Sequence, residues 1–386
     1  MTPAIKEVIF FCYGDSRKAS TWSNVPYLFT RALEEKGIRV RRVRLFRQGP
    51  LVWLCNEFIK WIYPLFFPGH AYGYLRTPLY RRGAFRKIRR AVKRYDKADL
   101  CIFTCFDFWN PFNGIPTLLF SDWTYEILIA ERLKRSLYPF EQRYAQWQAE
   151  AISSAGAVVS LFPECARSMR ERLPAANIHH LGSNVVNNLY DGVLLPEEII
   201  PRKKGAKRLL FIGGRKYEEG CRLLLEAFRR LQKEDPEYGL DVIGMHADRF
   251  SDVQIPPHVT FHGYLKKDHE PERRRYYELL LNASVFVNPT MVWGGYSSTI
   301  EAMFFYTPVI VAPYGDFVAE FGNAPAFGTY NREFTPECLY RSLREVLDNP
   351  HYEAMCLEAH RRTEHYTWDN YVDKILKLAQ DTTKEQ

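Results

Sequence analysis

A pair of glycines followed by two basic residues marks the first candidate site for chemistry. Gly213 and Gly214 follow a short apolar run, Arg208–Ile212, and precede Arg215 and Lys216. Glycines at a strand-to-helix turn let backbone N–H groups approach an anion, and the following helix adds the positive end of its dipole. The two basic side chains would add full charges to a bound diphosphate. The pattern predicts a diphosphate site; its structural alternative is a tight turn with solvated basic residues.

A second loop with two glycines, Gly294 and Gly295, leads into a helical pattern that carries Glu301. A carboxylate near the start of a helix suits the paired hydroxyls of a ribose, because one carboxylate accepts two hydrogen bonds. Ser298 and Thr299 stand at the helix start, where hydroxyls and N–H groups hold phosphate. The segment therefore predicts a nucleotide site, and the alternative is an N-capped helix with an ordinary first-turn glutamate.

The N-terminal half offers two aspartates at the ends of predicted strands. Gly14, Asp15 and Ser16 follow the apolar run Glu7–Cys12, and Asp122 follows another apolar run. Open α/β sheets bind ligands beyond the carboxyl ends of their strands. Either aspartate could orient or deprotonate a substrate hydroxyl, so both are catalytic candidates. The alternative is loop capping, to which aspartate is well suited.

Two successive α/β patterns must position these residues. Apolar runs of strand length alternate with helical segments in residues 1–195 and again in residues 208–365. Fully apolar strands joined by helices indicate parallel sheets that are covered on both faces. Residues 196–207 are rich in proline and charge without periodicity, which predicts a linker. We therefore expect an α/β protein with two doubly wound, Rossmann-like domains that face a cleft.

Positive charge is concentrated in one part of the chain. The sequence carries 53 Lys and Arg against 45 Asp and Glu, and 16 of the basic residues fall in Arg39–Lys97 beside only two acids. Within it, Leu51–Phe67 is rich in Trp and Phe but is too short and too polar to span a bilayer. Aromatic residues beside a dense cationic segment suit an anionic membrane surface, so we expect residues 51–97 to contact one. The alternative is aromatic side chains in the core or in a cleft, with a solvated basic face.

Other sequence features indicate which partners, metal ions and cellular location to expect. No nucleic-acid-binding motif accompanies the basic residues, so we expect no nucleic acid partner. The histidines, aspartates and cysteines show no clustered ligand spacing, so we expect no metal site. The chain opens on a strand-like run without a basic-then-apolar signal segment. These patterns predict a cytoplasmic protein, peripheral at the inner face of the membrane.

Taken in order, several short motifs of the C-terminal half resemble those of glycosyltransferase family 4. They are FIGG with LLLEAF, FHGYL, ELLLNASVFVNPT, GGYSSTIEAMFFYTPVIV and a late YTW, and they span about Arg208–Leu378. The resemblance implies the GT-B fold and a retaining, metal-independent transfer of a sugar from a nucleotide diphosphate sugar to a glycan or lipid-linked acceptor. It also implies a role in cell-surface polysaccharide or lipopolysaccharide assembly, and a C-terminal helix, residues 366–386, packed back on the first domain.

The same resemblance implies roles for individual positions. Glu301 occupies the place of the family's ribose-binding glutamate, and Trp293 stands where the family has a glutamate that contacts the donor sugar. Glu219 holds the place of the diphosphate-binding lysine, so one of the two basic residues after the glycine pair is expected to replace that lysine. Asp122 is the preferred catalytic candidate, because the family often has a functional acid or histidine in that region. The residues expected beside the acceptor or the donor sugar are Gly14, Ser16, Trp293, Gly294 and Gly295.

Two other functions would be consistent with these departures from the family pattern. A non-catalytic scaffold or sugar-nucleotide sensor would tolerate both Trp293 and Glu219. A sugar-nucleotide epimerase on the same fold is a third hypothesis, and it requires no acceptor. The substitution Glu301→Ala separates the first two hypotheses, because a transferase would lose turnover together with nucleotide affinity.

Overall fold

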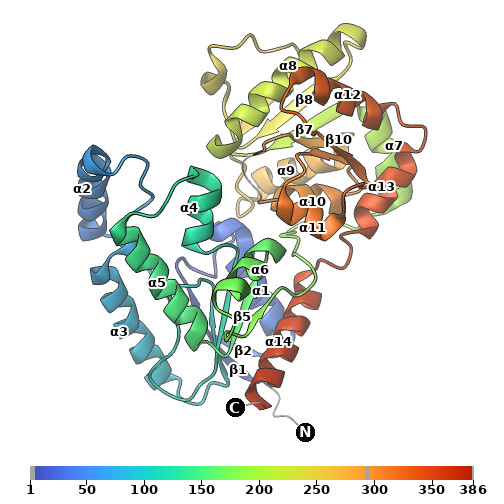
Figure 1. Cartoon of the computed structure of the whole chain (residues 1–386). Helices are drawn as coiled ribbons and strands as arrows, with labels where there is room; N and C mark the ends of the chain where they lie inside the picture. Colours follow the sequence, from blue (N-terminus) through green and yellow to red (C-terminus); the bar gives the residue numbers. More distant parts are fainter. Residues whose placement is uncertain (1–4, 292–294, 385–386) are drawn as a thin grey trace. The chain divides into compact units, whose positions relative to one another are not determined.

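The chain forms two compact α/β units in the computed structural model, which describes residues 5–291 and 295–384. The N-terminal unit contains Met1–Asn184 together with Trp368–Gln386, and the C-terminal unit contains Val185–Thr367. Each unit is built on a six-stranded parallel sheet flanked by helices (Figure 1). The predicted fold class, α/β with two Rossmann-like doubly wound sheets, is confirmed.

The sheet of the N-terminal unit consists of short, mostly buried parallel strands. They are β1 (Glu7–Cys12), β2 (Arg39–Arg44), β3 (Leu100–Phe103), β4 (Thr117–Ser121), β5 (Ala157–Ser160) and β6 (Ile178–His179). Their order in the sheet is β2-β1-β3-β4-β5-β6. Strands β3, β4 and β5 are buried along their whole length, as expected for a parallel sheet covered on both faces.

Helices cover this sheet on both sides. They are α1 (Val25–Glu35), α2 (Pro50–Phe66), α3 (Pro78–Arg94), α4 (Tyr125–Leu133), α5 (Pro139–Ser154), α6 (Pro163–Arg172) and α14 (Trp368–Lys384), with short 3-10 turns η1 (Trp22–Asn24) and η2 (Tyr74–Arg76). The C-terminal helix α14 packs against α1, where the ring of Trp368 lies 5.3 Å from that of Phe29. Lys36 of α1 also pairs with Asp369 and Asp373 of α14, at 2.6 and 2.8 Å. Helices α3 and α5 lie on the other side of the sheet from α14 (Figure 1).

The sheet of the C-terminal unit repeats the doubly wound pattern. Its strands are β7 (Arg208–Ile212), β8 (Gly239–Ile243), β9 (Val259–Gly263), β10 (Val285–Asn288), β11 (Val309–Val311) and β12 (Gly328–Tyr330). Their order is β12-β11-β10-β7-β8-β9. The elements between and after them are α7 (Pro196–Ala206), η3 (Arg215–Tyr217), α8 (Glu218–Glu234), η4 (Ala247–Phe250), α9 (Glu270–Asn282), α10 (Ser297–Phe304), α11 (Gly315–Phe321), α12 (Pro336–Leu347) and α13 (Tyr352–Arg361). The amphipathic helices α8 and α12 bury Leu224, Phe228, Leu339 and Leu343 in one core with the strands.

The segment predicted to be a linker is a helix of the C-terminal unit. Residues 196–207 contain α7, and the boundary between the units falls at Asn184–Val185 rather than after residue 195. Lys203 of α7 is fully buried, and its Nζ donates to the carbonyl oxygens of Leu280 (2.5 Å) and Ala283 (3.2 Å). Burial lowers the pKa of Lys203 to about 7. The absence of periodicity misled the prediction, because α7 is held by the adjacent buried residues Ile199 and Ile200 and by the buried Lys203, which together form no periodic apolar stripe.

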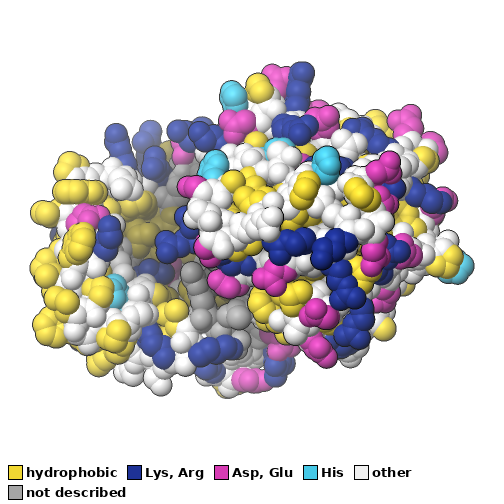
Figure 2. All heavy atoms as spheres, turned by 90° about the horizontal axis from the view of Figure 1, so that it is seen from above, with side chains coloured by type: hydrophobic (Ala, Val, Ile, Leu, Met, Phe, Trp, Pro, Cys, Tyr) yellow, Lys and Arg dark blue, Asp and Glu magenta, His cyan; other side chains and the backbone are white. Residues whose placement is uncertain are grey.

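Helix α2 exposes most of its apolar side chains. Only Val52 and Ile59 are buried. Its large exposed apolar residues are Leu51, Trp53, Leu54, Phe58, Trp61, Ile62, Leu65 and Phe66. Hydrophobic side chains gather at the left edge of Figure 2, over this helix. Among residues 5–291 and 295–384, no helix combines the length and the hydropathy that a membrane span requires.

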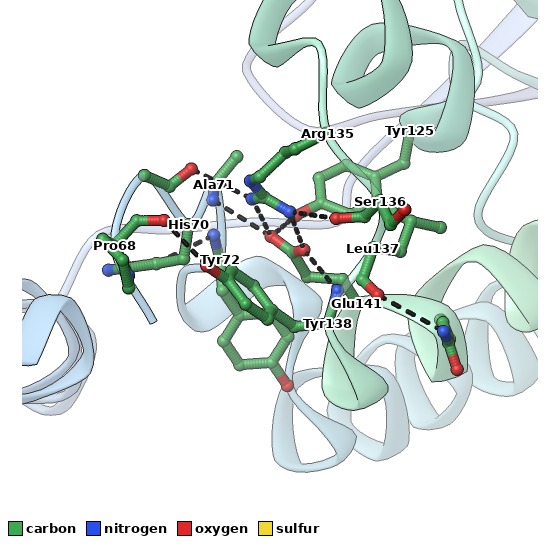
Figure 3. A network of polar contacts seen from close by, with 12 residues as sticks. Pro68, His70, Ala71, Tyr72, Tyr125, Arg135, Ser136, Leu137, Tyr138 and Glu141 are labelled. Carbon is green, nitrogen blue, oxygen red and sulfur yellow. Dashed lines mark hydrogen bonds and ion pairs between the residues drawn. The ribbon is translucent and has the colours of Figure 1, made fainter. Parts of the chain in front are cut away.

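A buried glutamate fastens the segment after α2 to α5 (Figure 3). The carboxylate of Glu141 is fully buried and accepts hydrogen bonds from Arg135 (2.7 and 2.9 Å), the Tyr125 hydroxyl (2.8 Å) and the backbone N–H groups of Ala71 (3.1 Å) and Tyr138 (3.0 Å). Burial raises the pKa of this carboxyl, but the Arg135 ion pair and the other hydrogen bonds outweigh burial and lower it to about 2. The loop that joins α2 to α3 is therefore held by a charged network of hydrogen bonds.

Candidate functional site

The strand order of the C-terminal unit defines where a ligand is expected. Strand β7 lies between β8 and β10, so the connections that leave β7 and β10 diverge at the carboxyl edge of the sheet. Such a switch point is the general ligand site of open α/β sheets. The glycine pair follows β7, and the segment that enters α10 follows β10. The residues predicted to hold diphosphate and ribose therefore belong to the two connections at this switch point.

The two glycines after β7 have different structural roles. The N–H of Gly213 donates to the carbonyl oxygen of Ile243 (2.9 Å), and a Cβ atom at Gly213 would lie 2.8 Å from the ring of Tyr217. A Cβ atom at Gly214 would meet nothing within 4 Å in the described structure. Gly213 is thus required for packing inside the turn, whereas the backbone at Gly214 is open to the approach of an anion.

Two close contacts join the connection after β7 to the connection after β10. The Tyr217 hydroxyl donates to the carbonyl oxygen of Gly295 (3.1 Å). Near the start of α8, a Cβ atom at Gly220 would lie 2.2 Å from Oγ1 of Thr290, so only glycine fits there. These contacts fix the two halves of the candidate site relative to each other.

The basic residues predicted to bind diphosphate lie on the short turn η3. Arg215 and Lys216 are both exposed, and Nζ of Lys216 lies 4.9 Å from the centroid of the Tyr217 ring. Arg215 makes no ion pair with another residue that the structure describes. In the first turn of α8, Glu218 instead pairs with Arg222 (3.1 Å) and Arg249 (3.2 Å). Arg215 and Lys216 are thus the cationic side chains closest in sequence to the open turn, as predicted.

Glu301 is held by three side chains that are not among the predicted site residues. Its two carboxylate oxygens accept hydrogen bonds from Nζ of Lys267, at 2.5 and 2.8 Å. The hydroxyl of Tyr276 donates to the same carboxylate at 2.8 Å, and the hydroxyl of Tyr277 at 3.4 Å. Lys267 comes from the loop after β9, and both tyrosines come from α9. The predicted ribose-binding carboxylate is therefore fixed in place by residues from two other elements.

This cluster is nearly closed to solvent. The side chains of Glu301 and Lys267 are 5% and 13% exposed. Burial lowers the pKa of Lys267, although the charge of Glu301 and its hydrogen bonds oppose this effect. Burial also raises the pKa of Tyr276 well above its ordinary value, with the Glu301 charge acting in the same direction. The tyrosines therefore act as neutral donors, and the charge of Glu301 is matched by Lys267.

The other residues predicted around α10 differ in accessibility. Ser298 is half-buried at the start of the helix, while Thr299 is only 1% exposed. The Thr299 hydroxyl bonds to Tyr314, whose pKa is raised chiefly by burial. Of the predicted sugar-contact residues, Trp293 and Gly294 lie outside the described residues. Gly295 is described, and its carbonyl oxygen is occupied by the Tyr217 hydroxyl.

The aspartate after β1 caps its own loop in the N-terminal unit. Oδ1 of Asp15 accepts from the N–H of Arg17 (3.0 Å), and the carbonyl oxygen of Asp15 accepts from Thr21 Oγ1 (2.8 Å). A Cβ atom at Gly14 would lie 2.5 Å from Thr21, so this glycine permits the tight loop. Ser16 is 2% exposed. In this structure Asp15 therefore caps its loop, which is the alternative to a catalytic role.

Asp122 follows β4 at the carboxyl edge of the same sheet. Its Oδ1 accepts from the N–H of Trp123 (2.8 Å) and from the Ser121 hydroxyl (3.3 Å), and its carbonyl oxygen accepts from the Ser160 hydroxyl (2.9 Å). The residue is half-buried. The carboxylate is therefore oriented by its neighbours at the sheet edge where a ligand is expected.

A third aspartate, Asp107, lies at the switch point of the N-terminal sheet. It follows β3, which is adjacent to β1. Its carboxylate accepts hydrogen bonds from the hydroxyls of Tyr13 and Tyr144 and from the amide of Gln148 (2.8 Å). Asp107 is 7% exposed, so it joins the loops after β1 and β3 to α5 from inside the fold. Asp107 was not among the predicted site residues, because it lies four positions beyond β3 between aromatic residues, with no motif that marks it.

Residues 206–349 match the family model described as Glycosyl transferases group 1. The match covers less than half of the chain and includes the glycine pair, Lys267 and Glu301. No curated protein sequence matches the chain. Within the described residues, no group of three or more His, Cys, Asp or Glu side chains could hold a metal ion.

Solved structures with related folds cover nearly the whole chain. Sucrose-phosphate synthase from Thermosynechococcus elongatus is 15% identical, with a TM-score of 0.70, over 99% of this chain and 100% of that one. WaaG, a glycosyltransferase involved in lipopolysaccharide biosynthesis, is 16% identical, with a TM-score of 0.61, over 97% and 99%. A putative UDP-N-acetylglucosamine 2-epimerase from Listeria monocytogenes is 14% identical, with a TM-score of 0.57, over 99% and 98%. At these identities the likeness establishes the GT-B type of fold.

Proposed function

We propose that this protein is a retaining glycosyltransferase that moves a sugar from a nucleotide diphosphate sugar to a glycan or lipid-linked acceptor. The observation that carries the proposal is the buried, oriented carboxylate of Glu301 on α10, in the part of the chain that matches the Glycosyl transferases group 1 model. A nucleotide-binding carboxylate must be held ready for two ribose hydroxyls, and here three donors orient it before any ligand binds.

Ribose binding requires one of these donors to move. A carboxylate offers about four acceptor positions, and in this structure Lys267, Tyr276 and Tyr277 make four contacts with it. The Tyr277 contact, at 3.4 Å, is the longest of the four. We therefore expect the ribose hydroxyls to replace Tyr277 first, while Lys267 stays paired with the carboxylate and holds it in place.

The connection after β7 would receive the diphosphate. The open backbone at Gly214 and the exposed cations Arg215 and Lys216 together offer N–H donors and full positive charges. During transfer, negative charge builds on the leaving diphosphate, and fixed cations and helix N-termini stabilise it. We propose that these groups do so without a metal ion, so turnover should be insensitive to EDTA and should need no added divalent cation.

The N-terminal unit would bind the acceptor. Asp122 is the favoured group to orient or deprotonate the acceptor hydroxyl, because its carboxylate stands at the carboxyl edge of the sheet. Asp15 is the second candidate, although its carboxylate already caps the loop. Asp122→Asn should lower turnover and leave nucleotide affinity unchanged, while Asp15→Asn should lower stability as well.

Helix α2 and the neighbouring helix α3 would hold the protein at an anionic membrane. Helix α3 carries eight basic residues and no acid, and α2 exposes its apolar side chains. Apolar side chains that enter the interface and cations that pair with lipid phosphates are the two components of peripheral membrane binding. We propose a cytoplasmic protein, peripheral at the inner face of the membrane, where a lipid-linked acceptor would be within reach.

A role in cell-surface polysaccharide or lipopolysaccharide assembly is the setting that we propose. It is supported by the motif resemblance and by the fold shared with WaaG. One alternative function is a sugar-nucleotide epimerase, which would change the sugar without an acceptor. The fold shared with the putative 2-epimerase supports this alternative. A non-catalytic scaffold or sugar-nucleotide sensor is the other alternative, because a scaffold or sensor would bind the donor without turning it over.

A transfer assay separates these functions. The purified chain is incubated with radiolabelled nucleotide sugars and a lipid extract, and the lipid-bound and free sugars are analysed by mass spectrometry and NMR. Label in the lipid fraction, with the anomeric configuration of the donor, is the expected result. Free epimer without acceptor would identify an epimerase, and binding without any product would identify a scaffold or sensor.

A further inference from the structure

An arginine-lined groove of about 480 Å³ lies on the N-terminal unit between α3 and α5. Figure 1 shows these two helices side by side. The groove is lined by Pro78, Arg81, Arg82, Phe85, Arg86, Arg89, Phe112 and Trp147. Four guanidinium groups and three aromatic rings thus share one concave surface, which the donor site in the C-terminal unit does not include.

Arg81 is the fixed member of this arginine cluster. Its Nη2 donates to Glu150 of α5 at 2.6 Å, and its guanidinium lies 4.8 Å from the Trp147 ring and 5.2 Å from the Phe85 ring. Its Nε is buried and has no hydrogen-bond partner in the described structure. A buried N–H without an acceptor costs free energy, so the packing of Arg81 against the two rings and its pair with Glu150 are maintained at a cost in stability.

The other arginines bring positive charge without matching acids. Arg82 and Arg86 are exposed one helical turn apart, and neither pairs with a carboxylate among the described residues. Arg89 lies one turn further, with its guanidinium 5.9 Å from the ring of Phe112. Glu150 is the one acid that contacts a groove arginine in the described part of the chain, so the groove is strongly cationic.

The aromatic walls distinguish this groove from a simple basic surface. Phe112 is 41% exposed, and Phe85 and Trp147 are half-buried at its sides. Flat aromatic faces offer apolar contact to one face of a ring, while arginine binds planar or tetrahedral anions through paired N–H groups. The volume of the groove lies within the range of small-molecule sites.

We propose that this groove binds an anionic saccharide, with a sugar ring on the aromatic walls and its phosphate or carboxylate on the arginines. The proposal rests on the proposed function only in expecting the ligand to be part of a glycan acceptor. Anionic lipid headgroups would need cations but not concave aromatic walls, so the exposed basic residues of α3 outside the groove, Arg90, Lys93 and Arg94, are sufficient for them. The acceptor would then be a phosphorylated or acidic glycan.

Calorimetric titration of the full chain tests this proposal. The probes are glucose 6-phosphate and glucuronate, which carry both a sugar ring and an anionic group. Glucose, which has no charge, and inorganic phosphate, which has no sugar ring, are the controls. The charged sugars are expected to bind more tightly than either glucose or inorganic phosphate. The double substitution Arg82→Gln with Arg86→Gln should weaken them about tenfold, as expected for lost charge-assisted hydrogen bonds. Arg90→Gln with Lys93→Gln is the matched control: it removes two exposed charges from the same helix outside the groove and should leave affinity unchanged.

Four outcomes would overturn the proposal. One is equal weakening by the two double substitutions, and another is equal affinity for inorganic phosphate and for the charged sugars. The third is no binding of either charged sugar at about 10 mM, where a ligand with a Kd of about 1 mM would occupy most sites. If the groove variant instead loses only its binding to phosphatidylglycerol vesicles, the arginines belong to the membrane surface and the saccharide site is refuted. Nucleotide binding measured on the same samples reports separately on the donor site.

Discussion

The Nζ atom of Lys267 lies within hydrogen-bonding distance of both carboxylate oxygens of Glu301, at 2.5 and 2.8 Å. The two residues are 34 positions apart, one on the loop after β9 and the other on α10. Tyr276 adds a further hydrogen bond from α9. The carboxylate is therefore oriented by the fold itself, which is the condition for binding ribose hydroxyls without a large rearrangement.

Removing the lysine should leave Glu301 as an uncompensated buried charge. We expect Lys267→Met to lower the free energy of unfolding by about 3 kcal/mol, the range found when one partner of a buried pair is deleted. Urea unfolding measures this value. Lys266→Met is the matched control, because Lys266 lies next to Lys267 in the same loop but is exposed. Equal stability of the two variants would show that Lys267 does not balance the charge of Glu301.

Gly214 should matter for the donor but not for stability. A Cβ atom at Gly214 meets nothing in the described structure, so Gly214→Ala should fold with an unchanged melting temperature. If the backbone there approaches a diphosphate, the added methyl group should weaken nucleotide affinity about tenfold, a loss of about 1.4 kcal/mol. Gly205→Ala on α7 is an equally open control. Unchanged nucleotide affinity in Gly214→Ala would remove this turn from the donor site.

Most strands of the two sheets could be predicted from the sequence because they are short apolar runs; the arginine-rich β2 is an exception to this composition. The predicted runs Glu7–Cys12 and Arg208–Ile212 coincide with β1 and β7. Helix α7 could not be predicted in this way, because Lys203 anchors it through carbonyl groups of a distant segment. A pattern of local hydrophobicity carries no information about such a contact.

In the candidate site, too, some residues could be predicted from local sequence and others could not. Local turn chemistry is sufficient to single out Gly213, Gly214 and Glu301. The partners of Glu301 depend on how the loop after β9 and α9 fold over α10, which only the tertiary structure reveals. The same holds for Asp107, whose donors come from the loop after β1 and from α5.

Glu141 should make stability depend on pH in the acid range. Its pKa in the folded protein, about 2, lies below the ordinary value of 4.5, so the unfolded chain binds more protons between these values. The stabilisation is therefore complete above about pH 4.5 and is lost as pH falls toward 2. We expect Glu141→Gln to be less stable than the wild type at pH 7, with a difference that shrinks as the pH falls below 4.5.

Chemical unfolding at pH 7 and at successively lower pH values measures this difference. Glu171→Gln, at an exposed pair with Arg167, is the control and should change stability little at any pH. A wild-type advantage over Glu141→Gln that stays constant across the acid range would show that the Glu141 network stabilises the protein without a shifted pKa.

The exposed face of α2 should control membrane binding. Trp61 and Phe66 are 68% and 71% exposed, so Trp61→Ser with Phe66→Ser should not alter the melting temperature. We expect the pair to reduce co-sedimentation with phosphatidylglycerol vesicles at least about tenfold, because apolar insertion supplies part of the affinity. Phe334→Ser, an exposed aromatic of the C-terminal unit, is the control. Vesicle binding that is unaffected by the pair, or equally affected by Phe334→Ser, would contradict membrane docking by α2.

Binding of nucleotide sugars by wild type and by Glu301→Gln is the most direct test of the central claim. Thermal shift is measured with UDP-, GDP-, dTDP- and CMP-sugars, and ligand at about 100 times its Kd should add about 2.7 kcal/mol of stability. We expect at least one nucleotide sugar to stabilise the wild type, and Glu301→Gln to fold but to lose most of that stabilisation. An equal shift in both proteins, or no shift with any nucleotide sugar, would contradict a donor site built around Glu301.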